Sequence, residues 1–158
     1  MMYTVNDQDI FDAEFLEDQI VQNLKGYEGY KPTWYTDTEG YETIGFGFKK
    51  DSLRLSRQVS SLILREKIND LYINMAVYPW FLEINPNARM VLVELSYQVG
   101  IAGMLKFKKM LKAIQDNDYI TASKEILDSK LARQTPQRVK DLSKRLLECR
   151  NLKKSAQQ

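Results

Sequence analysis

Three side chains in the first third of the chain have types and spacing that could carry out acid and base catalysis. Glu28 precedes a glycine, Asp37 follows nine residues later, and Thr43 comes six residues after Asp37. A carboxylic acid can protonate a leaving group while a second, ionised carboxylate activates water or stabilises positive charge. Cleavage of a glycosidic bond is one reaction that uses such a pair.

The composition excludes several other mechanisms. The 158 residues include no histidine and one cysteine, Cys149, so a Ser-His-Asp triad, a Cys-His pair and an imidazole metal site are all ruled out. One cysteine cannot form an intramolecular disulfide, and the sequence has no C-x-x-C, P-loop or G-x-G-x-x-G motif. Acid and base catalysis must then use carboxylates, lysine, tyrosine or the thiol, and we expect neither a metal nor a cofactor.

The net charge of +2 conceals an uneven distribution. Residues 1–50 hold 4 basic and 10 acidic side chains, whereas residues 130–154 hold 9 basic and 2 acidic ones. Two interpretations of the basic end remain open: a solvated helix face, or a surface that meets an anionic partner such as nucleic acid or cell-wall polymer. No apolar run approaches the ~20 residues of a membrane span, and the acidic N-terminus lacks the pattern of a signal peptide.

The candidate catalytic residues lie in a glycine-rich part of the chain. Five of the seven glycines fall between residues 26 and 47, and aromatic and β-branched residues alternate with turn formers over residues 30–48. This pattern predicts a β-hairpin with Gly40 at a position of positive φ. Because glycine weakens a strand, Gly45 and Gly47 indicate close approach by another backbone or by a ligand.

Helical periodicity dominates the rest of the chain. An apolar face predicts a helix at about residues 9–26, and a long helical pattern covers residues 56–76 before Pro79 stops it. Asn85-Pro86 and Thr135-Pro136 both carry the cap-then-proline signal of a helix start. Further helices are expected at residues 86–99, ending at Gly100, and at 107–114, 119–127 and 136–152. The predicted fold class is therefore α+β, mostly α.

Several short motifs occur together with characteristic spacing. They are Glu28-Gly29, Tyr35-Thr36-Asp37, Gly40-Tyr41-Glu42-Thr43, Ile44-Gly45-Phe46-Gly47, Tyr97-Gln98-Val99-Gly100 and Gln134-Thr135-Pro136-Gln137-Arg138. In combination they resemble the phage-type lysozymes, the T-even phage muramidase family (glycoside hydrolase family 24), over about residues 21–147. Two positions depart from that family's pattern, since Phe48 stands where many members have His and Leu131 where they often have Trp.

The resemblance implies a lysozyme-like, two-lobe fold within a single domain of residues 1–158. A small lobe with the β-sheet would cover about residues 27–55, and a connecting helix would cover residues 56–76. The helical lobe would consist of residues 77–152 together with the N-terminal helix at 9–26. The substrate cleft is expected between the lobes, with the candidate carboxylates on the small-lobe side.

The resemblance also implies roles for individual residues. Glu28 would be the proton-donating acid, and Asp37 the base or the stabiliser of an oxocarbenium-like transition state. Thr43 would help to hold the attacking water, and Arg138 would form an ion pair that orients Glu28. Substrate contacts are expected from the remaining matched positions, Gly47, Lys49, Tyr97, Gln98 and Lys130.

The implied function is hydrolysis, with inversion, of the β-1,4 bond between N-acetylmuramic acid and N-acetylglucosamine in bacterial peptidoglycan. Three alternatives stay open: a lytic transglycosylase acting on the same bond, a non-catalytic cell-wall-binding or virion structural protein, and a nucleic-acid-binding helical domain. The last would explain the basic end but not the glycine strand, so nucleic acid is not the expected partner.

We expect a monomer that stays in the host cytoplasm before it is released to the cell wall or periplasm, or that is carried in a virion. The resemblance implies a membrane-permeabilising phage protein or a virion component as its partner.

Overall fold

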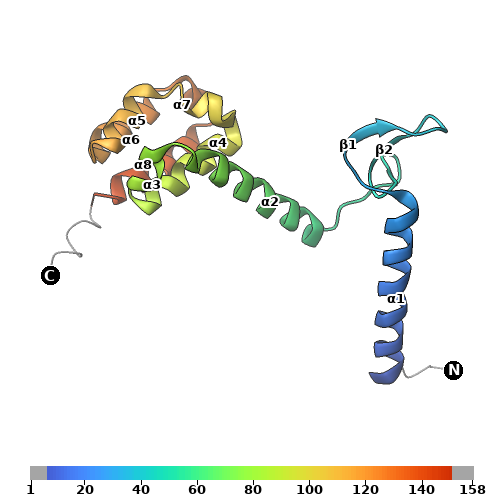
Figure 1. Cartoon of the computed structure of the whole chain (residues 1–158). Coiled ribbons are helices and arrows are strands. Elements are labelled where there is room, and N and C mark those ends of the chain that lie inside the picture. Colours follow the sequence, from blue (N-terminus) through green and yellow to red (C-terminus); the bar gives the residue numbers. More distant parts are fainter. Residues whose placement is uncertain (1–6, 151–158) are drawn as a thin grey trace. The chain divides into compact units, whose positions relative to one another are not determined.

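The computed structural model describes residues 7–150, with side chains from Leu16 onward, and divides into two compact units, residues 1–56 and 57–158. The described chain is mostly helical and contains a three-stranded antiparallel sheet, which confirms the predicted α+β class (Figure 1). The last helix ends at Glu148, before its predicted end near Leu152, a residue that lies outside the described part of the chain.

The first unit contains one helix followed by the sheet. Helix α1 spans Asp7–Glu28, two residues beyond the predicted range at each end, so Glu28 is its last residue. Gly29 follows with φ +66°, a left-handed conformation that commonly ends helices because glycine adopts it without steric cost. The end of α1 thus delivers Glu28 directly to the start of the sheet.

The sheet is formed by three short strands in the order β1-β2-β3. Strand β1 spans Lys31–Thr36, β2 spans Glu42–Gly45 and β3 spans Phe48–Lys49. Thr43, in the middle strand β2, lies opposite Tyr35 of β1 on one side and Lys49 of β3 on the other. Gly40, in the turn between β1 and β2, has the predicted positive φ at +88°.

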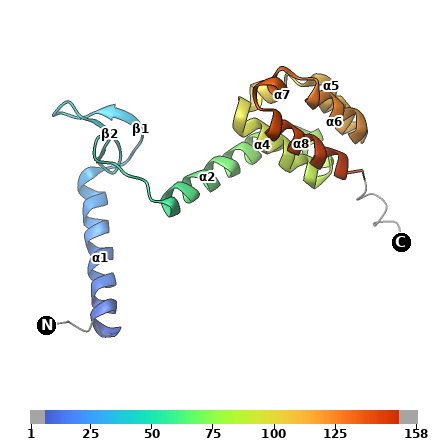
Figure 2. The same cartoon turned by 180° about the vertical axis from the view of Figure 1, so that it is seen from behind.

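The second unit is entirely helical within its described part. Its helices are α2 (Arg57–Ala76), α3 (Pro79–Glu83), α4 (Pro86–Met104), α5 (Lys108–Gln115), α6 (Tyr119–Leu127), α7 (Lys130–Gln134) and α8 (Pro136–Glu148). Helix α4 is the central core helix that its apolar sequence predicted, and α8 packs against α4, α6 and α7 (Figure 2). The fully buried core includes Met75, Phe81, Leu92, Leu95, Met104, Ile114, Ile126, Leu142 and Leu146.

Proline and glycine positions account for most differences from the predicted helices. Pro79 follows α2, as predicted, and it also lies in the first turn of the short helix α3. A proline costs nothing at that position, because an N–H in the first turn has no partner within the helix. Gly100 interrupts α4 with φ +75° and ψ 161°, but helical structure resumes and continues to Met104. The short helix α7 was not predicted either, and its Ser129 side chain caps it by accepting a bond from Ala132 N–H.

The two predicted cap-then-proline signals have different outcomes. Asn85 caps α4 as expected, because its side-chain oxygen accepts a hydrogen bond of 2.8 Å from the N–H of Asn87. Thr135 precedes Pro136 at the start of α8 but makes no side-chain cap. Its hydroxyl instead donates to the Leu131 carbonyl at 3.3 Å and accepts from the Gln98 side chain at 2.9 Å. A tertiary contact has replaced the local cap.

None of the described helices is by itself long and apolar enough to cross a membrane. Only α4 and α5 taken together meet that length and composition, and the two are bent by 112°.

Helices α4 and α8 are joined by a forked ion pair. Arg145 donates two hydrogen bonds of 2.6 Å to the two carboxylate oxygens of Glu94, and its Nε lies 3.1 Å from Asp141. The hydrogen bonds from Arg145 lower the pKa of Glu94 below its usual value. The stabilisation from this pair is therefore present above the unfolded pKa of glutamate and is lost as the pH falls through the lowered folded value.

Arg145→Met, which keeps an apolar stem, should lower the free energy of unfolding at neutral pH by about 1 kcal/mol, since the pair is partly exposed and screened. Urea unfolding of the native protein and of Arg145→Met, at neutral pH and again at a pH below the ordinary pKa of glutamate, measures this difference in the free energy of unfolding. The difference should shrink in acid, while Lys140→Met, on the same helix, should have little effect at either pH. An equal loss at both pH values would contradict the account.

Candidate active site

The Glu28 carboxylate lies directly against the backbone of Gly47. A Cβ atom built on Gly47 would stand 2.6 Å from Glu28 Oε2, closer than any ordinary contact, and Gly47 has φ +79°. The positive φ therefore favours glycine at this position, and a Cβ atom here would push the exposed Glu28 carboxylate aside. The close approach that the glycine strand predicted is thus made by a carboxylate at the end of α1.

Asp37 is held in the turn between β1 and β2 by its own neighbours. Its Oδ1 accepts hydrogen bonds from the N–H groups of Tyr41 at 2.8 Å and Glu39 at 2.9 Å. The Asp37 N–H in turn donates to the Tyr41 carbonyl at 2.9 Å. These bonds, the one from Tyr41 first, lower the pKa of Asp37 below its usual value, so that the group stays ionised.

Thr43 connects the turn to the sheet. Its side chain is buried, with 2% exposure, and its hydroxyl lies 3.4 Å from Asp37 Oδ2 and 3.2 Å from the Tyr41 carbonyl. A hydroxyl has one proton and can donate to only one of these acceptors at a time. Thr43 can therefore keep a bond to the turn while its oxygen lone pairs accept a bond from another group, such as a water.

Lys49 is engaged by the same turn. Its Nζ lies 3.0 Å from the Glu39 carboxylate and 3.9 Å from the centre of the Tyr41 ring, and the Glu39 bond raises the pKa of Lys49. The positive charge of Lys49 also contributes to the lowered pKa of Asp37. Its predicted contact with substrate stays a prediction, but its ammonium has clear structural partners.

The substitution at position 48 has a local explanation. A Cβ atom built on Gly45 would lie 2.9 Å from the Phe48 ring, so the ring packs onto the bare backbone of that glycine. Phe48, which the sequence comparison with the phage-type lysozymes marked as a departure from His, therefore makes an apolar contact within the sheet.

The remaining predicted site residues belong to the second unit. Tyr97 is exposed on α4, and Lys130 is the exposed first residue of α7. Gln98 donates to Thr135, whereas its buried Oε1 has no partner among the described residues. Arg138 donates from Nη2 to the Glu94 carbonyl at 3.3 Å. The expected Arg138–Glu28 pair and the substrate contacts of Tyr97, Gln98 and Lys130 remain predictions.

The structure adds groups that the sequence analysis did not single out. Tyr41 and Glu39 supply the backbone donors that hold Asp37, and Asp-Thr-Glu-Gly is a turn sequence in which an Asp side chain commonly accepts such bonds. That signal could have identified the Glu39 donor. Lys50 and Glu42 form a second ion pair on the sheet, which no sequence motif indicated. Within residues 16–150, no three Cys, Asp or Glu side chains gather closely enough to hold a metal ion.

The chain is similar to several known proteins. Residues 25–147 match the family described as Phage lysozyme. The chain is 30% identical to Probable T4-type lysozyme 1 of Dictyostelium discoideum, over 75% of this chain and 88% of that protein. Probable T4-type lysozyme 2 of the same organism is 28% identical, over 73% of this chain and 85% of that protein. The Pre-baseplate central spike protein Gp5 of Enterobacteria phage T4 is 29% identical over 73% of this chain but only 25% of its own length.

Gly47→Ala should displace the Glu28 carboxylate, because the added methyl group occupies its place. The change should shift the Glu28 side-chain carboxyl resonance in a carbon-detected NMR spectrum. Gly40→Ala is the matched control, since Gly40 also has positive φ but has nothing within 4 Å of an added Cβ. Both variants should lose about 1 kcal/mol of stability, because each places a side chain on a backbone with positive φ. Only Gly47→Ala should shift the Glu28 carboxyl resonance. A Glu28 resonance unchanged in Gly47→Ala would refute the contact.

An NMR titration of the Asp37 carboxyl should give a pKa below the ordinary value of aspartate, since two backbone N–H groups bond the charged form. Thr43→Val removes only the smallest of these contributions, so it should raise the pKa slightly and leave it below the ordinary value. Thr38→Val, in the same turn, should leave the pKa unchanged. Titration of Asp37 at or above the ordinary value in the native protein would show that the backbone bonds are not formed.

Proposed function

The chain belongs to the phage lysozyme family, and on that premise we propose that it is a peptidoglycan hydrolase with Glu28 and Asp37 as its catalytic carboxylates. The bond cleaved would be the β-1,4 linkage between N-acetylmuramic acid and N-acetylglucosamine. The observation that carries the proposal is the Asp37 turn, in which a carboxylate is held ionised and hydrogen-bonded beside a buried threonine hydroxyl. A merely structural turn has no need of the second carboxylate packed against Gly47 in the same unit.

The two carboxyl groups have surroundings suited to different roles. Asp37 accepts several hydrogen bonds, which favours the charged form that a base needs. Glu28 is the second carboxyl group in the same unit, at the end of α1 and against Gly47, and we assign it the role of the acid. One carboxyl group that donates a proton and one that stays charged are the pair that this reaction needs.

The proposed reaction proceeds in one displacement. Glu28 donates its proton to the glycosidic oxygen as the bond to the anomeric carbon breaks, and Asp37 accepts a proton from the water that attacks the opposite face. The Thr43 hydroxyl oxygen, positioned beside Asp37 Oδ2, helps to hold that water. Inversion of this kind needs carboxyl groups about 6.5–9.5 Å apart, which leaves room for the water.

A lytic transglycosylase is the nearest alternative, because it could use Glu28 alone. It would have no need of a base, and the hydrogen bonds that keep Asp37 charged beside Thr43 favour hydrolysis instead. The similarity to the central spike protein Gp5 supports a setting in a virion, whereas the similarity to the T4-type lysozymes supports a separate enzyme. Both settings need the same chemistry at the site.

Glu28→Gln should reduce release of muropeptides from purified peptidoglycan by at least about 100-fold, since the amide cannot donate a proton as an acid does. Asp37→Asn should cause a loss of similar order. Glu66→Gln, which changes an exposed carboxylate on α2 in the same way, should retain full activity.

Mass spectrometry of the products separates the alternatives. Hydrolysis gives reducing muramic acid ends, and a transglycosylase gives anhydro-muramoyl ends two hydrogens and one oxygen lighter. Substantial residual activity in Glu28→Gln would show that Glu28 is not the catalytic acid. Anhydro products from the native protein would show that the enzyme is a transglycosylase and not a hydrolase.

A further inference from the structure

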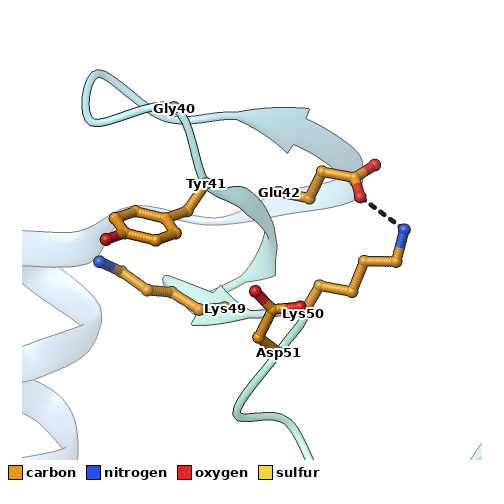
Figure 3. Close-up of a pocket in the computed structure, with 6 residues that line it drawn as sticks. All are labelled: Gly40, Tyr41, Glu42, Lys49, Lys50 and Asp51. Atoms are coloured by element: carbon orange, nitrogen blue, oxygen red, sulfur yellow. Dashed lines mark hydrogen bonds and ion pairs between the residues drawn. The ribbon is translucent and has the colours of Figure 1, made fainter.

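The Lys49 side chain contacts the two residues whose backbones hold Asp37. Its Nζ lies 3.0 Å from the Glu39 carboxylate and 3.9 Å from the centre of the Tyr41 ring, and Figure 3 shows the lysine chain running alongside that ring. The N–H groups of the same two residues, Glu39 and Tyr41, donate hydrogen bonds to Asp37 Oδ1. One ammonium group on β3 therefore contacts both of these donors in the turn between β1 and β2.

The backbone of Lys49 is fixed by its neighbours. Lys49 lies opposite Thr43 in the sheet, and its carbonyl accepts hydrogen bonds from the N–H groups of Ser52 at 3.1 Å and Leu53 at 2.9 Å. The Ser52 hydroxyl donates to the same carbonyl at 3.2 Å. The side chain thus extends from a backbone that the sheet and the following turn hold in place, so its ammonium can restrain the turn that it contacts.

We propose that Lys49 is a positioning residue for Asp37, because it ties Glu39 and Tyr41 to β3 and so keeps their N–H groups directed at the carboxylate. This role rests on the proposed function of Asp37 as the base. It differs from the substrate contact that the family resemblance implied for Lys49, since the ammonium acts here on the protein's own turn. Exposed ion pairs and cation–π contacts are individually weak, so we expect a reduction in catalysis and not its loss.

Two effects of Lys49 on Asp37 must be separated. The groups that act on the Asp37 charge are Glu39 and Tyr41 in the turn, Thr43 on β2 and Lys49 on β3. The Lys49 charge lowers the pKa of Asp37 directly, and the positioning role would lower it through the N–H bonds of the turn. Both effects have the same sign when Lys49 is changed. A change at Glu39 separates them, because charge and geometry then act in opposite directions.

Glu39→Met removes the carboxylate partner of Lys49 and one negative charge close to Asp37. Loss of a like charge alone would lower the pKa of Asp37, whereas a turn released from Lys49 would weaken the N–H bonds and raise that pKa. We expect an NMR titration of the full-length protein to give a higher Asp37 pKa in Glu39→Met than in the native protein, with faster hydrogen exchange at the Tyr41 amide. An equal or lower pKa would overturn the positioning role.

Kinetics on a soluble peptidoglycan fragment test the role of Lys49 in catalysis. Lys49→Met should lower kcat about three- to tenfold and leave KM unchanged. Lys49→Arg should restore kcat, because a guanidinium can keep both the ion pair and the ring contact. Lys50→Met is the matched control, since Lys50 also pairs with a carboxylate, that of Glu42, and lies 5.9 Å from the centre of the Trp34 ring. Neither partner of Lys50 bonds Asp37 within the described chain, so this variant should change neither constant.

The outcomes of the kinetic experiment distinguish the two roles of Lys49. A raised KM with unchanged kcat in Lys49→Met would show that Lys49 contacts the substrate, and it would overturn the positioning role. An unchanged kcat and KM would overturn it as well. If the native protein does not cleave the fragment, the proposed function fails, while the titration of Glu39→Met still decides whether Lys49 positions Asp37.

Discussion

The candidate site depends on the absence of a side chain at Gly47. Its positive φ would strain any other residue, and a Cβ atom there would displace the Glu28 carboxylate that lies against it at the end of α1. Gly29 also has a left-handed backbone conformation, and it directly follows Glu28, the last residue of α1. Gly29 and Gly47 therefore place the Glu28 carboxylate between the end of α1 and the sheet.

The second constraint is that the same hydrogen bonds close the turn at Asp37 and support the catalytic role proposed for its carboxylate. The N–H groups of Glu39 and Tyr41 both bond Oδ1, which closes the turn and keeps the carboxylate charged, while Oδ2 remains toward Thr43. The turn loses these bonds to the charged form as the pH falls through the lowered pKa of Asp37. Closure of the turn and the charged state of the proposed base thus depend on the same hydrogen bonds.

Local sequence signals predicted the helices and turns well where a residue interacts with its neighbours in the chain. Asn85 caps α4, Gly40 adopts positive φ, and residues 119–127 form a helix with the predicted bounds. These local signals failed where a residue distant in the sequence competes for the same hydrogen-bonding group. Thr135 has the sequence of a cap, but its hydroxyl bonds Gln98, which is 37 positions away in the chain. The same limit applies to the candidate site. Motif spacing singled out Asp37 and Thr43 as candidates, and the structure places their side chains 3.4 Å apart. The pairing of Lys49 with Glu39 and of Lys50 with Glu42 depends instead on strand register, which the motifs do not show.

The central claim is that a charged Asp37 directs water to the face of the sugar opposite the acid. The configuration of the newly formed reducing end tests it most directly. Proton NMR of a soluble peptidoglycan fragment, recorded within the first minutes of cleavage and before mutarotation, distinguishes the two anomers. An inverting mechanism predicts that the α-anomer forms first from the β-linked substrate. Initial formation of the β-anomer, which signifies a retaining mechanism, would contradict it.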